Sequence, residues 1–325
     1  MSRDILTEII YAHRCRSTHH YIVVDALAHL TGPDADTWRD LFLVEHASLL
    51  RGAKAPDAEF KDFKNHVLHV GGDKEWGGAR GAATEWYDRA VDALKARKWV
   101  AGAYALGVLS HYYADPLQPF HTGQTEEEGI LHGALEWSLF KSRPVLKQRM
   151  ESRPAATVHA GTDSGFVSDM VRAGAGASFP HYQTFIDHYD IHAGKKRPED
   201  GPDDVLLDAA ADLLNHAIRG VALLMSRAIE DAGVKPKTVS TSLPTFMARL
   251  DIPVRKMLKK IDDAGARREI EAAYKEFEAT GKVIKALSDD DAEIRALHAK
   301  QVAGRDLKDL DAQAPQPTGR KFEGR

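Results

Sequence analysis

The spacing of the apolar residues constrains the fold of this chain more than any other feature. Between residues 203 and 232 the apolar residues form one helical stripe, and the Asp-rich start of this segment suits a helix N-terminus. The pattern from Tyr87 onward predicts two more helices that meet near residues 96–98. No run shows the strict alternation of a half-buried strand. The chain is therefore expected to be all-α.

The composition narrows the class of protein. Of the 325 residues, 43% are hydrophobic and 28% are charged, which is typical of a soluble globular protein. The net charge of -4 gives no overall attraction to nucleic acid or to an anionic membrane. Cys15 is the single cysteine, which favours a reducing compartment. Residues 1–30 contain no apolar run long enough for a signal peptide, and no later run reaches the ~20 apolar residues that span a bilayer. We therefore expect a cytoplasmic protein.

Glycine-rich stretches and changes in composition suggest how the chain is divided. Glycine-rich stretches predict loops at 71–81, at 193–204 and in part of 161–179. Near Ser240 the composition shifts to Lys, Arg, Asp, Glu and Ala. The expected division is a helical domain at 1–240, a charged helical C-terminal extension at 241–312 and a flexible tail at 313–325.

The stretch GVLSHYYADPLQPFH, residues 107–121, holds the first set of candidate ligands. His111 and Asp115 are four residues apart, so they face the same side of a helix and can bind one ion. Pro116 and Pro119 end the helix and turn the chain. This turn is expected to bring His121 back toward the same space.

A second pair, His132 and Glu136, repeats the four-residue spacing, and His121 is placed to complete a three-ligand set with it. One such pair alone is common on solvated helix faces. Five candidate ligands lie within 26 residues, on helices with apolar stripes, and we do not expect all of them to be solvent-exposed. Those that are buried need partners, because a buried carboxylate is costly without one. Imidazole and carboxylate ligands without thiolates are typical of catalytic zinc. The sequence therefore predicts a catalytic metal site.

The spacing H-x3-D-x5-H followed by H-x3-E, within LGVLSHYYADPLQPFH and the residues after it, resembles the bacterial zinc-dependent phospholipase C family. It is more distantly similar to the single-strand-specific zinc nucleases of the same fold. The resemblance covers roughly residues 15–140. It implies an all-helical phosphodiester hydrolase with a cluster of three zinc ions.

The resemblance also implies roles for individual residues. His111 and Asp115 would bind a pair of zinc ions, with Asp115 bridging them. The stretch LLRGAKAPD resembles the family's L-x2-G-x4-D segment, which makes Asp57 a ligand of this pair and a candidate general base. The implied ligands of the separate zinc are His121, His132 and Glu136.

Two ligand positions stay open at this point. FKNH indicates His66, but HVLHV leaves His69 as an alternative. STHHYIV indicates His19, with His20 as its rival. In the family, the mature N-terminal residue also binds a zinc, whereas Met1 lies 18 residues before His19 here. Either another group such as His13 replaces that ligand or the third ion is weak or absent, so we expect two or three Zn²⁺ ions.

The implied reaction is phosphodiester hydrolysis. Two zinc ions sharing Asp115 would lower the pKa of a bridging water, and the resulting hydroxide would attack phosphorus. The expected substrate is a phospholipid or a small soluble phosphodiester. The alternatives are a nuclease of the same fold, which the overall acidity disfavours slightly, and a non-catalytic metal-bearing scaffold. In that last case the C-terminal helices would mediate protein contacts.

Overall fold

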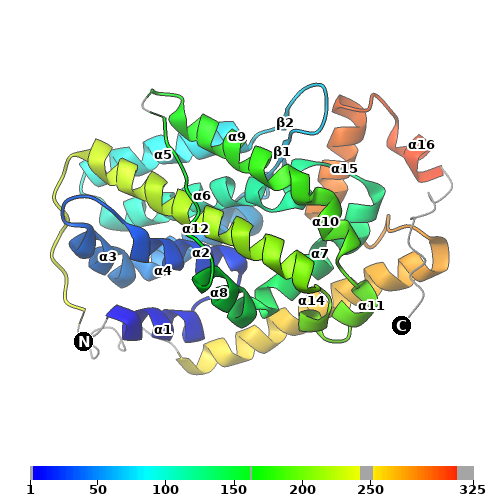
Figure 1. The fold of residues 1–325 in the computed structure, drawn as a ribbon, viewed down its shortest axis with the longest axis horizontal. Helices are drawn as coiled ribbons and strands as arrows, with labels where there is room; N and C mark the ends of the chain where they lie inside the picture. Colours follow the sequence, from blue (N-terminus) through cyan, green and yellow to red (C-terminus); the bar gives the residue numbers. More distant parts are fainter. Residues whose placement is uncertain (1–2, 162, 242–251, 313–325) are drawn as a thin grey trace.

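The computed structural model describes residues 3–161, 163–241 and 252–312 (Figure 1). The predicted all-α fold is confirmed, and the two strands, β1 (Leu68–His69) and β2 (Trp76–Gly77), form only a short antiparallel pair. The longer helices are α1 (Arg3–His13), α2 (Thr18–Ala26), α3 (Ala35–Val44), α4 (His46–Ala55), α5 (Ala79–Lys95), α6 (Trp99–Ala114), α7 (Glu126–Lys141), α8 (Arg143–Glu151), α9 (Phe166–Ser178), α12 (Asp204–Ala232), α14 (Ile252–Thr280) and α15 (Asp289–Gln301). The shorter ones are α10 (Tyr182–Asp187), α11 (Ile191–Gly194) and α16 (Leu307–Ala312).

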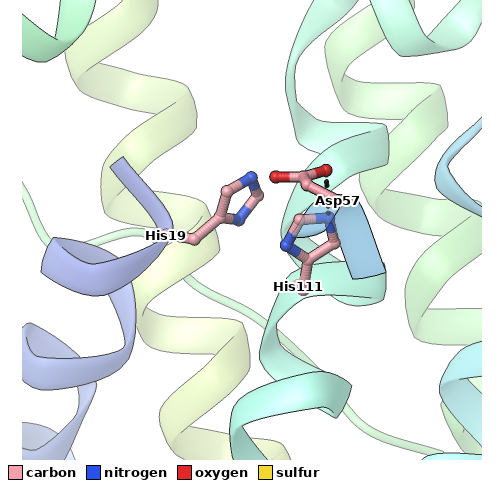
Figure 2. Close-up of side chains that lie close together, drawn as sticks. All are labelled: His19, Asp57 and His111. Carbon is pink, nitrogen blue, oxygen red and sulfur yellow. Dashed lines mark ion pairs between the residues drawn. The ribbon is translucent and has the colours of Figure 1, made fainter. Parts of the chain in front are cut away.

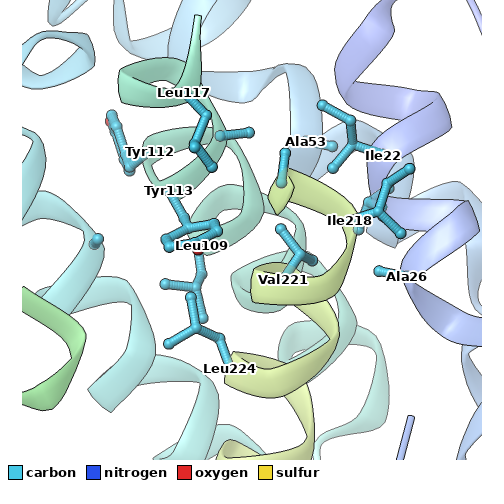
Figure 3. Close-up of a cluster of buried hydrophobic side chains, with 14 of the residues drawn as sticks. Ile22, Ala26, Ala53, Leu109, Tyr112, Tyr113, Leu117, Ile218, Val221 and Leu224 are labelled. Atoms are coloured by element: carbon cyan, nitrogen blue, oxygen red, sulfur yellow. The ribbon is translucent and has the colours of Figure 1, made fainter. Parts of the chain in front are cut away.

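Helix α12 crosses the middle of the molecule and packs against α2, α5, α6, α8 and α9 (Figure 1). Its buried stripe includes Ile218, Val221 and Leu224, which lie among side chains from α2, α4 and α6 (Figure 3). Asp203 accepts a hydrogen bond from the backbone N–H of Leu206 and so caps the helix at the predicted place. Burial of this apolar stripe packs α12 against α2 and α6, which carry candidate ligands.

Helices α4 and α6 approach each other more closely than ordinary side chains permit. A Cβ on Gly52 would lie 2.1 Å from the backbone oxygen of Tyr104, and one on Gly107 would lie 2.2 Å from that of Leu49. Glycine at both positions lets the two backbones touch. The end of α4 therefore lies directly beside the part of α6 that carries His111.

The predicted end of α6 is confirmed. The helix stops at Ala114, and two short 3-10 turns follow at Asp115–Leu117 and Pro119–Thr122. Each turn holds a proline in its first positions, where the missing N–H costs nothing. The chain therefore reverses between Asp115 and His121.

One loop prediction is wrong. The glycine-rich part of 161–179 is expected to be a loop, but α9 occupies Phe166–Ser178. Gly174 there lies against Leu117, and a Cβ would meet the Leu117 side chain at 3.2 Å. Glycine has a low helix propensity, but at position 174 its small size allows the close contact with Leu117 within a helix. The loop predicted at 71–81 also holds β2 and the start of α5.

The C-terminal part is helical, as predicted, and packs on the rest of the molecule. Helix α14 contacts α7, and α15 contacts the turn Phe63–His66. The predicted boundary after residue 240 adjoins residues 242–251, which lie outside the described residues, as does the predicted tail at 313–325. The division into 1–240 and 241–312 stays a prediction. Among the described residues, no helix combines the length and apolarity needed to cross a membrane.

Candidate metal centre

His111 lies at the centre of the first group of candidate ligands and is fully buried. Its Nδ1 lies 2.9 Å from the backbone oxygen of Ala53, which only accepts hydrogen bonds, so Nδ1 carries a proton and donates it. Its Nε2 points the other way, 3.0 Å from Oδ2 of Asp115 and 3.3 Å from Oδ1 of Asp57. The helix contact with α4 therefore fixes which ring nitrogen faces the carboxylates.

His66 approaches the same carboxylates from the turn Phe63–His66. Its Nδ1 lies 2.9 Å from Oδ2 of Asp115 and 3.1 Å from Nε2 of His111. Its other nitrogen, Nε2, faces Oδ1 of Asp62 at 3.5 Å. Tyr112 donates a hydrogen bond to the same carboxylate and so holds Asp62 in place. The outer carboxylate orients the ring with Nδ1 toward the group.

His19 completes this side of the site from α2. Its ring stacks on that of His111 at a centroid distance of 3.9 Å, and its Nε2 lies 3.1 Å from Oδ1 of Asp115. Figure 2 shows His19, Asp57 and His111 converging from three separate segments. The neighbouring His20 turns away, because its Nε2 lies 3.0 Å from the backbone oxygen of Leu50 and its Nδ1 accepts from a backbone N–H.

Asp57 lies in a π-helical turn, Pro56–Phe60, that directly follows α4. Such turns widen the helix locally and often occur at functional sites. The Lys54 ammonium, one turn earlier, donates a hydrogen bond to the Asp57 carboxylate. Burial lowers the pKa of Lys54, but Asp57 raises it to a net value above its usual range, so the lysine stays charged.

The charges in this group are strongly coupled. Burial raises the pKa of Asp115, but the adjacent histidines, His111 first, hold it well below its usual range. Burial lowers the pKa of His111, but Asp115 and Asp57 raise it to about 10. In the same way, hydrogen bonds to Asp115 and Asp62 outweigh burial and raise the pKa of His66 to about 9. The Asp115 carboxylate is thus ionised, and its negative charge favours cationic groups beside it.

The second group contains His121, His132 and Glu136. Oε1 of Glu136 lies 3.4 Å from Nε2 of His121 and 3.3 Å from Nε2 of His132. His132 and Glu136 share one face of α7, and the turn Pro119–Thr122 brings in His121. On its far side, Nδ1 of His132 faces Oε1 of Glu128 at 3.1 Å and Oδ1 of Asp291 at 2.8 Å.

The ligand spacings in both groups fit zinc. Two atoms bound to one tetrahedral zinc at about 2.0–2.1 Å lie roughly 3.3 Å apart. The contacts of His66 and His111 with Asp57 and Asp115 fall between 2.9 and 3.4 Å, the longest being the one from His66 Nδ1 to Asp57 Oδ1, and Glu136 meets both of its histidines at 3.3–3.4 Å. The donor set, imidazole nitrogen and carboxylate oxygen, also matches catalytic zinc. The residues present therefore fit this metal.

A single cavity of about 840 Å³ is lined by members of both groups, and only the fully buried His111 among the eight ligands does not reach it. Lys54 and Arg16 bring positive charge to its wall. Much of the remaining wall is apolar, with contributions from Phe120, Phe140 and Phe185. The cavity therefore combines candidate ligands and charged groups with apolar side chains.

Residues 18–175 match the family model described as zinc dependent phospholipase C. Over this range the chain resembles the zinc-dependent phospholipase C family. The matched range contains every candidate ligand from His19 to Glu136, and the resemblance predicted from the motifs is confirmed. The family is zinc-dependent, which agrees with the fit of the two groups to that ion.

Solved structures add evidence on the fold. The chain is similar to the alpha-toxin of Clostridium perfringens from an avian strain and to the alpha-toxin of Clostridium absonum, each with a TM-score of 0.50 and 14% identity. The two matches cover 70% and 68% of this chain, and the chain spans 66% of each toxin chain. At this identity the likeness shows the fold alone. No curated protein matches the chain.

The structure brings eight of the nine predicted ligands of the phospholipase C-like segment into the two groups: His19, Asp57, His66, His111, Asp115, His121, His132 and Glu136. The ninth, His69, lies outside them and packs against Trp76 and His298 at centroid distances of 4.8 and 5.1 Å. His13, which ends α1, is likewise in none of the groups formed by the described residues.

Sequence reasoning missed three residues at the site. Glu128 lies four residues before His132, so the extended spacing E-x3-H-x3-E was a usable signal. Lys54 lies within the LLRGAKAPD motif but is not a ligand type. Asp291 is 155 positions beyond Glu136 in an acidic run, and no local pattern connects it to the site.

Proposed function

We propose that this chain is a zinc-dependent phosphodiester hydrolase that acts as a phospholipase C. The observation that carries the proposal is the convergence of two His/carboxylate groups on one cavity, with spacings that suit zinc. The match of residues 18–175 to the zinc-dependent phospholipase C family model supports it. Two or three ions are proposed, because among the described residues the group of His19, Asp57 and His111 shares His111 with the group of His66, His111 and Asp115.

The proposed ligands of the paired ions are His19, Asp57, His66, His111 and Asp115, and those of the separate ion are His121, His132 and Glu136. Bound zinc would neutralise phosphate oxygens and lower the pKa of a water ligand into the neutral range. Asp57 is the proposed general base, because its carboxylate stays ionised beside His111 and Lys54 and borders the cavity. The Lys54 ammonium, which also lines the cavity, attracts the anionic substrate toward the zinc ligands.

The proposed substrate is a phospholipid or a small soluble phosphodiester. The apolar side chains of Phe120, Phe140 and Phe185 suit hydrocarbon in the same cavity as the proposed zinc ligands. A nuclease would use stacking aromatics and basic residues, and the cavity wall holds both kinds, so the comparison of lecithin with single-stranded DNA decides between the two. A cytoplasmic location is also proposed, and cell fractionation with an antibody to the chain tests it.

The test begins with zinc content of protein purified without a histidine tag. Hydrolysis of bis-p-nitrophenyl phosphate is then measured with and without chelator, followed by a comparison of lecithin with single-stranded DNA. We expect chelator-sensitive turnover and preference for the lipid. His111→Ala should lose both zinc and activity, whereas His159→Ala, at an exposed histidine outside the groups, should keep both.

Specific outcomes would overturn the proposal. Zinc-loaded protein with no activity on any of these substrates would support the scaffold alternative. Preference for single-stranded DNA over lecithin would support the nuclease alternative. Unchanged zinc content in His111→Ala would show that the first group is not the metal site.

A further inference from the structure

The two ring nitrogens of His132 have different surroundings. Nε2 faces the candidate ligands, 3.3 Å from Oε1 of Glu136. Nδ1 faces two other carboxylates, Glu128 from the same helix and Asp291 from α15. Because carboxylates only accept hydrogen bonds, Nδ1 carries a proton and donates it, and Nε2, on the side of Glu136, is the nitrogen that would bind an ion.

Asp291 makes the shorter of the two contacts. Its Oδ1 lies 2.8 Å from Nδ1 of His132, against 3.1 Å for Oε1 of Glu128. The separation of 2.8 Å is a hydrogen-bond length. Glu128, His132 and Asp291 also lie close enough together to form a candidate ion-binding group, but the ring nitrogen that faces Asp291 is not the one that faces Glu136. An imidazole that binds zinc through Nε2 donates its Nδ1 proton to an outer acceptor, and Asp291 is placed to be that acceptor.

The two carboxylates also differ in what else they do. Oε2 of Glu128 accepts hydrogen bonds from the Tyr182 hydroxyl and from the backbone N–H of Thr125, where Glu128 completes the capping box of α7. Asp291 is held on its other oxygen, Oδ2, by the hydroxyl of Ser288. Glu128 thus builds the start of α7, whereas the position of Asp291 depends on α15.

Helix α15 is fixed firmly enough to place this carboxylate. Ile294 is buried with Phe63 and Val67, next to the turn that carries His66. The buried Arg295 forms an ion pair with Glu126, in the first turn of α7. At the far end, the Gln301 side chain accepts hydrogen bonds from the Lys64 ammonium and the Trp76 indole. Apolar burial and charge pairing together hold α15 against both ligand-bearing segments.

We propose that Asp291 is a positioning residue that orients His132 as a zinc ligand, so that α15 of the C-terminal segment is a working part of the metal centre. The inference rests on the proposed function, since it assumes that the group of His121, His132 and Glu136 binds zinc. It assigns a role to a helix that lies beyond the family match at residues 18–175. Loss of the Asp291 contact frees the ring to rotate and weakens its basicity at Nε2.

The experiment measures zinc binding to the full chain by competition with a chromophoric chelator, for wild type, Asp291→Ala and Asp291→Asn. Asp289→Asn is the matched control, because it removes the same charge from the same first turn of α15 at a side chain that is 87% exposed. We expect Asp291→Ala to weaken one zinc site about 10–100-fold and leave the others unchanged. Asp291→Asn should show a smaller loss, since its amide oxygen still accepts from Nδ1, and Asp289→Asn should bind as wild type.

Two further readouts separate positioning from a merely structural role. The visible spectrum of the cobalt(II)-substituted protein should change in Asp291→Ala and not in Asp289→Asn. The metal-free forms should unfold at similar denaturant concentrations. Equal zinc affinity and cobalt spectra in wild type and Asp291→Ala would overturn the inference, as would a loss confined to the stability of the metal-free protein. If wild type itself binds no zinc, the proposed function fails first.

Discussion

Nδ1 of His111 lies 2.9 Å from the backbone oxygen of Ala53, so a contact between two helix backbones sets the tautomer of the most buried candidate ligand. The contact depends on the close approach of α4 and α6 at Gly52 and Gly107. Packing and metal chemistry therefore share one structural requirement. Widening the gap between these helices should disturb both.

Gly107→Ala tests this relationship. The new Cβ would lie 2.2 Å from the backbone oxygen of Leu49, so α4 and α6 must separate. We expect the free energy of unfolding to fall by about 1–3 kcal/mol. We also expect weaker zinc binding, because the Ala53 oxygen moves away from Nδ1 of His111. Denaturant unfolding of the metal-free protein and chelator competition measure the two effects.

Gly176→Ala is the matched control. Gly176 is exposed in α9, and a Cβ there meets nothing within 4 Å. The substitution should raise the free energy of unfolding by about 0.5–1 kcal/mol, since alanine favours the helix, and should leave zinc affinity unchanged. If both alanine variants behaved alike, the α4–α6 contact would not be what limits the size of residue 107.

Lys54 should act on substrate and not on metal. Lys54→Met removes a charge from the cavity wall but no zinc ligand. We expect zinc content to be kept and KM for a phosphodiester to rise about tenfold, equivalent to roughly 1.4 kcal/mol of lost binding. Inhibition by inorganic phosphate should weaken in parallel. Lys95→Met, at an exposed lysine at the end of α5, is the control and should match wild type. An unchanged KM in Lys54→Met would remove this lysine from substrate binding.

Local patterns were enough for most of the fold and for the ligands that lie close together in sequence. The four-residue spacing placed His111 with Asp115 and His132 with Glu136, because helix geometry alone decides which residues share a face. The helix at Phe166–Ser178 was missed, because its glycines serve tertiary packing that propensity does not register.

Contacts between residues far apart in the chain could not be predicted from the sequence. The choice between His66 and His69 depends on the turn Phe63–His66, which directs His66 toward Asp115, while His69 enters the β1–β2 pair. The contact of Asp291 with His132 joins residues 159 positions apart. It exists only because Ile294 and Arg295 dock α15, and no spacing rule connects those segments.

Zinc removal should destabilise the protein in a pH-dependent way. Carboxylates and imidazoles gathered at one point release the ion as acid protonates them, because protons and zinc compete for the same lone pairs. We expect chelator to lower the thermal unfolding midpoint, with added zinc restoring it. The midpoint difference between zinc-loaded and metal-free protein should shrink as the pH falls from 7 to 5. A midpoint that chelator leaves unchanged at pH 7 would argue against tight zinc binding by the folded chain.

The stability of the apoprotein should depend on the ionisation of His69. This side chain is 5% exposed, and neither of its ring nitrogens has a hydrogen-bond partner among the described residues. Burial first, and then the nearby His298 and His121, lower its pKa to about 3. The folded state therefore keeps His69 neutral, whereas the unfolded chain takes up a proton below about pH 6.5.

The sign of the effect follows from that difference. The unfolded state binds more protons than the folded state between pH 6.5 and 3, so stability falls as the pH drops through this range. From pH 7 to pH 5 this one group should cost about 2 kcal/mol. In His69→Phe, which keeps an aromatic ring against Trp76 and cannot ionise, the loss over the same range should be smaller by that amount.

Urea unfolding of the chelator-treated protein at several pH values measures the slope. His159→Phe, which changes an exposed histidine, is the control and should follow the wild-type profile. Chelator treatment keeps competition between zinc and protons out of the comparison. Parallel profiles for wild type and His69→Phe would show that His69 binds a proton in the folded state as readily as in the unfolded one, which its buried position beside Trp76 and His298 is expected to prevent.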